Sequence, residues 1–60
     1  MQVKYNFKDG RQFSQEIPDD ELAVGELFKL VVRGKHENAD IATNSENLKY
    51  EDVHSVELIL

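Results

Sequence analysis

The stretch that decides the fold is residues 3–17, VKYNFKDGRQFSQEI, in which apolar and polar side chains alternate on both sides of Asp9-Gly10. Alternation with a period of two is typical of strands that bury one face, and Asp-Gly is a strong signal for the turn of a β-hairpin. The sequence therefore predicts two antiparallel strands joined at this turn.

The length of the hairpin loop decides which residues face one another. A two-residue loop would pair Asn6 with Phe13, and because paired residues share a face, Phe13 would point away from the other apolar side chains. A three-residue loop over residues 8–10, with Gly10 in the left-handed conformation as a G1 bulge, pairs Tyr5 with Phe13 instead. That register brings the apolar residues of both strands to one face, so we predict the three-residue loop.

Residues 18–34 carry the signals of a helix. Pro18 ends the second strand, and Asp19-Asp20-Glu21 supplies an N-cap candidate and carboxylates that suit the positive end of the helix dipole. Gly34 is well placed to end the helix in the left-handed conformation. We predict a helix over residues 20–33.

The apolar side of this helix is wide. At about 100° per residue its apolar side chains cover an arc of about 200°, whereas a helix laid on one small sheet needs little more than about 100°. These side chains are Ala23, Val24, Leu27, Phe28, Leu30, Val31 and Val32. Two explanations stay open: the sheet curls around the helix, or a flank that contains Phe28 and Val32 meets another molecule.

The rest of the chain predicts less structure. Residues 35–47 are mostly polar and typical of loops and turns, except that residues 41–43 support a short strand. Residues 55–60 alternate between apolar and polar positions and predict a final strand, preceded by Leu48 and Tyr50 in a connection that the pattern does not define. The fold class is α+β, an antiparallel sheet with one helix packed on it, in the order strand-strand-helix-strand-strand, and residues 1–60 form one domain.

Self-association is an expectation from size. A domain of 60 residues has a small core and commonly needs a disulfide, a metal or a partner subunit. The chain has no cysteine, and its two histidines lack the spacing of metal ligands. We therefore predict a homodimer, with an interface at Phe28, Val32 and Ile59, the last being an apolar residue on the outer face of the final strand.

The net negative charge of the chain comes from residues 36–60. Residues 1–35 carry six basic and six acidic side chains, so the net charge of −5 arises after them. There Lys49 stands alone against Glu37, Asp40, Glu46, Glu51, Asp52 and Glu57. Such a segment repels a phosphate backbone and attracts a basic protein surface, so direct nucleic-acid binding is disfavoured. The simpler interpretation is an acidic surface that keeps the domain soluble.

No motif predicts catalysis, a metal or a cofactor. The serines, glycines and histidines fall outside the patterns of nucleophile, phosphate and zinc sites, and a domain this small has little room for a pocket. Helix capping explains Asp19-Asp20-Glu21 without a cation. The hairpin aromatics fall on the core side, which argues against a base-stacking platform, although Lys4 and Lys8 form a weak basic patch on the outer face.

The sequence also bears on location. It opens with no leader of basic and then apolar residues, and no apolar run approaches the roughly 20 residues that span a membrane. The lack of cysteine fits a reducing compartment. We expect a cytoplasmic protein that is not inserted in a membrane.

The segment Asp9-Gly10-Arg11-Gln12-Phe13, followed by Glu26-Leu27-Phe28 in a helix, resembles the small phage-encoded inhibitors of uracil-DNA glycosylase over about the first 35 residues. The resemblance implies a homodimer whose acidic residues mimic the DNA backbone in the groove of the enzyme, and whose apolar dimer pocket captures a protruding leucine. It matches Glu26 and Phe28 to helix positions of that family. The region after Gly34 is longer than one final strand of the family needs.

We predict a non-enzymatic acidic module that binds a host protein with a basic surface, such as a nucleic-acid enzyme. The partner-binding residues would be Glu26, Phe28, Glu46, Glu51, Asp52 and Glu57. Two other hypotheses stay open. The chain could be a structural or assembly subunit without an inhibitory role, or a small regulator associated with nucleic acid.

Overall fold

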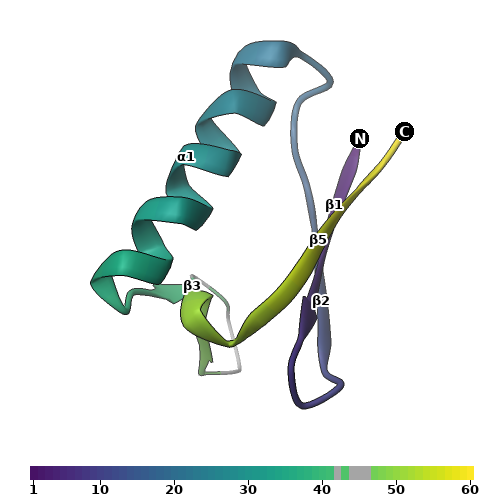
Figure 1. Cartoon of the computed structure of the whole chain (residues 1–60). Coiled ribbons are helices and arrows are strands. Elements are labelled where there is room, and N and C mark those ends of the chain that lie inside the picture. The colour runs from purple at the N-terminus through teal and green to yellow at the C-terminus, as the bar shows by residue number, and fades with distance from the viewer. Residues whose placement is uncertain (42, 44–46) are drawn as a thin grey trace.

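A computed structural model describes residues 1–41, 43 and 47–60. It contains a three-stranded antiparallel sheet in the order β2-β1-β5, one α-helix, and a separate antiparallel pair, β3 and β4 (Figure 1). The elements are β1 (Gln2–Phe7), β2 (Gln12–Glu16), α1 (Glu21–Glu37), β3 (Asp40–Ile41), β4 (Leu48–Lys49), the 3-10 helix η1 (Tyr50–Asp52) and β5 (Val53–Ile59).

The α+β class, the antiparallel sheet and the α-helix are confirmed, and the strand arrangement needs a correction. The predicted short strand near Ile41 exists as β3, but it pairs with β4 at Leu48–Lys49 rather than joining the main sheet. The sequence prediction left Leu48 in an undefined connection. Two residues are too few to show a period, so β4 and its pairing with β3 could not be predicted from the pattern.

The hairpin has the predicted three-residue loop. Tyr5 lies opposite Phe13, and their rings stack with centroids 5.9 Å apart. The amide of Phe7 donates to the carbonyl of Arg11 at 2.9 Å, and the amide of Gly10 donates to the carbonyl of Phe7 at 3.0 Å. Gly10 has a φ of 95°, the left-handed conformation that a G1 bulge requires.

The helix begins as predicted but ends later. The Asp20 carboxylate accepts a hydrogen bond from the amide of Ala23 at 2.8 Å, which is the expected N-cap. Gly34, predicted to end the helix, lies inside it, and Asn38 caps the C-terminus with a φ of 56°. A Cβ atom on Gly34 would overlap the ring of Tyr50. This glycine therefore allows the helix to pack closely against Tyr50 and does not end the helix.

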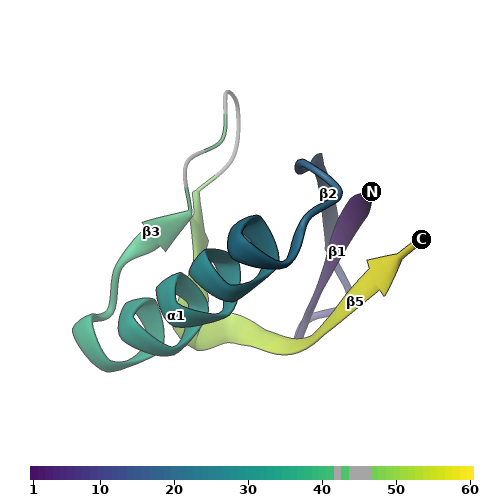
Figure 2. The same ribbon diagram turned by 90° about the horizontal axis from the view of Figure 1, so that it is seen from above.

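The core lies between the helix, the sheet and the β3–β4 pair. Its buried members are Val3, Tyr5, Phe7, Leu27, Val31, Ile41, Leu48, Tyr50 and Val53. Figure 2 shows α1 with β1, β2 and β5 on one side and β3 on the other. Among the described residues, no helix has both the length and the apolar character needed to cross a bilayer.

The sheet does not curl around the whole apolar arc of the helix. Leu27 and Val31 are buried, whereas Phe28 is 42% exposed and Val32 is 58% exposed. Leu30, on the other flank, is 46% exposed. The described part of the chain therefore leaves both flanks of the arc open to solvent.

Candidate functional site

The outer face of the sheet is a polar network with balanced charge. The side chain of Asn6 donates to Ser55 Oγ at 3.1 Å and to Glu57 Oε1 at 2.9 Å, and it accepts from Gln12 Nε2 at 3.1 Å. Lys4 lies directly opposite Glu57 in the β1–β5 register. The expected basic patch of Lys4 and Lys8 therefore has a carboxylate beside it, so the charge on this face is mixed, although no ion pair joins the described residues Lys4 and Glu57.

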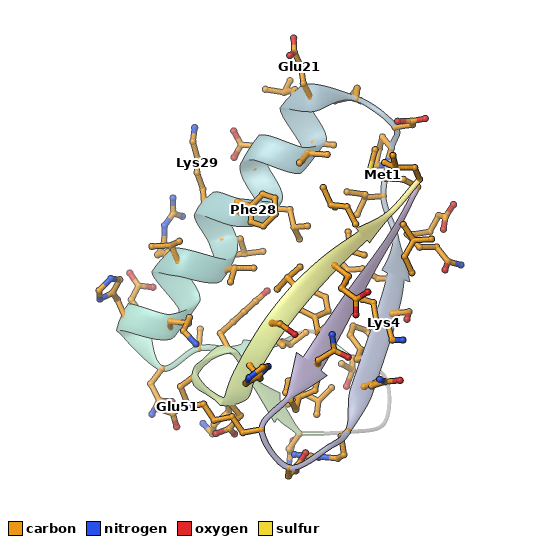
Figure 3. All side chains as sticks on the ribbon, turned by 45° about the vertical axis from the view of Figure 1, so that its right-hand side comes forward. Met1, Lys4, Glu21, Phe28, Lys29 and Glu51 are labelled. Atoms are coloured by element: carbon orange, nitrogen blue, oxygen red, sulfur yellow. The ribbon has the colours of Figure 1, made fainter. Side chains whose placement is uncertain are left out.

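A second group of polar residues lies where the helix C-terminus meets η1. With its amide oriented to donate, Asn38 Nδ2 lies 3.0 and 3.2 Å from the two carboxylate oxygens of Glu51. Lys35 Nζ donates to the carbonyl of Val53 at 3.1 Å, and the amide of Lys8 donates to the carbonyl of Asp52 at 2.9 Å. These contacts fasten η1 to both α1 and the hairpin, and Figure 3 shows Glu51 at this end of the molecule.

The exposed carboxylates after residue 36 occupy two separate places. Glu37 and Glu51 are exposed where α1 ends and η1 begins, and Glu57 is exposed on the outer face of the sheet. Asp52 is half-buried. Glu46 lies outside the described residues. Among the carboxylates that the structure describes here, only Asp40 forms an ion pair, with Lys49 at 3.2 Å.

The two predicted helical residues point in different directions. Glu26 and Phe28 are two positions apart, which separates their side chains by about 160° around the helix axis. Glu26 Oε1 lies 3.7 Å from Lys29 Nζ on the solvent side. The structure thus places Glu26, Phe28, Glu51 and Glu57 on different parts of the surface rather than in one patch.

The predicted dimer residues also divide into two groups. Phe28 and Val32 lie together on α1, on the walls of a shallow, open depression that Gly25, Lys29 and Arg33 complete. Ile59, which is 42% exposed, lies opposite Gln2 on the outer face of the sheet, because its neighbour Leu58 is the one opposite the buried Val3. Ile59 is therefore on the face of the sheet that points away from the helix.

Sequence reasoning missed Gly25, Lys29 and Arg33 as members of this depression. Gly25 precedes Phe28 by three residues, Lys29 precedes Val32 by three, and Arg33 follows Lys29 by four, which is the spacing of neighbours on one side of a helix. The signal was a glycine in mid-helix, where alanine is favoured by about 1 kcal/mol.

Three ionisable groups in the described residues have pKa values shifted by structural causes, and one of them is Tyr50, whose pKa is raised by burial. Burial raises the pKa of Tyr5 to about 12, with a further contribution from Tyr50. The backbone amide of Arg11, which donates to Asp9 Oδ1 at 2.9 Å, lowers the pKa of Asp9, and the Arg11 side chain lies 2.7 Å from Asp9 Oδ2. The shifts of the two tyrosines belong to the core, and that of Asp9 belongs to the hairpin turn.

The described residues contain no group of three or more His, Cys, Asp or Glu side chains placed to hold a metal ion. No protein-family model matches the chain, and searches of curated proteins and of solved structures found no significant match.

Proposed function

We propose that this chain is a non-enzymatic protein-binding module that works as a homodimer and recognises a partner with a basic surface through its acidic residues after position 36. The observation that supports the proposal most directly is the exposure of Glu37, Glu51 and Glu57 without ion pairs to lysine or arginine in the described part of the chain. Exposed charges of one sign accelerate association with a surface of the opposite sign.

The resemblance to phage inhibitors of uracil-DNA glycosylase names the class of partner to test first. In this proposal the target is a nucleic-acid enzyme, and the carboxylates occupy the groove that normally binds the phosphate backbone. Glu51 and Glu57 are the best candidates for direct contact, because both are exposed and each is oriented by an asparagine amide, Asn38 and Asn6 respectively.

Neutralising substitutions test the proposal while keeping the hydrogen bonds. The double variant Glu51→Gln/Glu57→Gln retains an acceptor oxygen at both positions, so the fold should persist. The matched control, Glu16→Gln/Asp19→Asn, removes the same charge from exposed positions before residue 36. We expect the first variant to slow association with a uracil-DNA glycosylase, and the control to leave the association rate near that of the unmodified chain, at low salt.

Salt provides the second arm of this experiment. Surface charges are screened over about 8 Å at physiological ionic strength, so the association rate of the unmodified chain should fall as salt rises. The double variant should show a weaker dependence. Equal rates for the double variant and the control would show that the acidic residues only solubilise the domain, and the absence of any binding to the glycosylase would exclude that enzyme as the partner.

A further inference from the structure

One stripe of α1 points almost directly away from the core. At about 100° per residue, Glu21, Gly25, Phe28, Lys29, Val32 and His36 fall within an arc of about 100° whose centre lies about 150° from the buried Leu27. Figure 3 shows Glu21, Phe28 and Lys29 along this helix, with Glu21 at its N-terminal end. We call these six residues the outer stripe.

The glycine in the outer stripe has no role within one copy of the chain. Apart from its chain neighbours and its own helix backbone, a Cβ atom on Gly25 would meet none of the described residues within 4 Å, whereas one on Gly34 would overlap Tyr50. Glycine within a helix costs about 0.5–1 kcal/mol relative to alanine, so the fold of a single chain would favour alanine at position 25. The missing side chain leaves a notch beside Phe28 and Val32.

The outer stripe is complementary to itself when two copies run antiparallel. A two-fold axis between Phe28 and Lys29 brings Gly25 of each copy opposite Val32 of the other. The side chain of Val32, which is 58% exposed in one copy, would fill the notch at Gly25. The same axis places the ring of Phe28 against the Lys29 side chain of the other copy. Both the apolar stem and the ammonium group of this lysine interact favourably with the face of an aromatic ring.

The charges of the stripe agree with this orientation. Glu21 lies in the first helical turn and His36 in the last, and the two-fold axis brings them opposite each other. Antiparallel helices also place each dipole end beside the opposite end of its neighbour. An acidic peptide would suit Lys29 and Arg33 but would meet Glu21, whereas a second copy satisfies both ends of the stripe.

We propose that the outer stripe is the surface through which two copies of this chain associate, as antiparallel helices with Val32 of each inserted at Gly25 of the other. The inference deepens the homodimer of the proposed function and replaces Ile59 in the predicted interface with Gly25. A single pair of helices buries less than the roughly 800 Å² per partner of a standard interface, so the dimer should dissociate in the micromolar range or above.

Filling the notch tests the proposal by sedimentation over a concentration series. Gly25→Gln places a long side chain where Val32 should enter, and we expect it to weaken dimerisation by at least about tenfold, which is 1.4 kcal/mol. Because glutamine favours helix more than glycine does, the variant should stay folded. Leu30→Gln is the matched control, since it puts the same side chain on the opposite flank of the helix, where Leu30 is 46% exposed, and it should leave dimerisation unchanged.

Single cysteines test the orientation, because the chain has no cysteine of its own. When Gly25→Cys and Val32→Cys chains are mixed in equal amounts and oxidised, antiparallel pairing favours the mixed disulfide over either symmetric one. Parallel pairing would favour the symmetric products and would overturn the model. A statistical mixture, or an unmodified chain that stays monomeric at about 1 mM, would equally overturn it.

The two proposals fail separately. If Gly25→Gln leaves sedimentation unchanged while Glu51→Gln/Glu57→Gln still slows binding to the glycosylase, the helical interface is wrong and the acidic binding surface stands. If Gly25→Gln abolishes the dimer and the acidic variant binds normally, the dimer interface stands and the acidic surface is wrong.

Discussion

The hairpin of residues 2–16 and the segment of residues 34–53 differ in how far apart in the sequence the residues that determine their structures lie. In the hairpin, Gly10 and the alternation of side chains within a few positions determine loop, register and burial. In the second segment, Gly34 and Ile41 take their conformations from partners that come later in the sequence, Tyr50 and Leu48. The structure of the hairpin can be predicted from residues close together in the sequence, whereas that of the second segment depends on contacts between positions far apart.

The largest effect is expected where the second region depends on one side chain. Tyr50 is 5% exposed and packs against Gly34, and its amide donates to the carbonyl of Ala39 at 3.1 Å. Replacing it with alanine should lower the free energy of unfolding by about 3–5 kcal/mol, as large aromatic truncations in cores do. Chemical denaturation measures the change, and a loss below about 1 kcal/mol would show that this contact is dispensable.

Gly34→Ala should lower the free energy of unfolding by about 1–3 kcal/mol, because the added methyl group overlaps the ring of Tyr50. The control is the same substitution in a Tyr50→Ala background. There the ring is gone, and alanine should be neutral or should stabilise by up to about 1 kcal/mol through its higher helix propensity. If Gly34→Ala lowers the free energy of unfolding by the same amount in both backgrounds, the result would contradict a direct contact between these residues.

Gly10→Val tests the local region. A branched residue in the left-handed conformation costs about 1–2 kcal/mol, and the free energy of unfolding should fall by that amount. Gly10→Asn is the matched variant, since asparagine tolerates this conformation, and its loss should be smaller. Equal losses for the two variants would argue against a requirement for positive φ at this position.

An effect of alkaline pH should connect the two regions. Burial holds the pKa of Tyr5 at about 12 and also raises the pKa of Tyr50, so both phenols stay neutral in the folded chain above the pH at which they ionise when unfolded. This stability is fully present below pH 10 and is lost as the pH rises from about 10 to about 12. Denaturation curves across this range should show it, and Tyr5→Phe should reduce the dependence.

The contrast explains how far the sequence could predict the fold. The predicted register was correct because a one-residue slip would have divided Tyr5 from Phe13, and period-two alternation makes such a slip visible. The predicted helix end was wrong because glycine is typical both of a left-handed cap and of a close contact, and only Tyr50, sixteen positions later, distinguishes them at Gly34. Asn38 forms the actual C-cap, but in the sequence an asparagine is a weaker signal of a helix end than the glycine at position 34.

The candidate surfaces were predictable to a similar extent. The wide apolar arc left two explanations open, and the exposure of Phe28 and Val32 argues against a sheet that curls around the whole helix. It did not show that Ile59 belongs to another face, because that depends on how β5 pairs with β1 across more than 50 positions of sequence. The role that we propose for Gly25 in the outer stripe could not be predicted from the sequence, because it rests on the open space that the described residues leave beside this glycine.

The central position of β1 has a consequence for how the chain is made. Of the elements described here, β1 is synthesised before all the others, and one of its two neighbours in the sheet, β5, is synthesised after them, with Gln2 opposite Ile59 (Figure 1). The hairpin can form early, but one edge of β1 has no partner in the sheet until β5 has been synthesised. Until then this edge can pair with a strand of another chain, so the domain is open to misassociation while it is being synthesised.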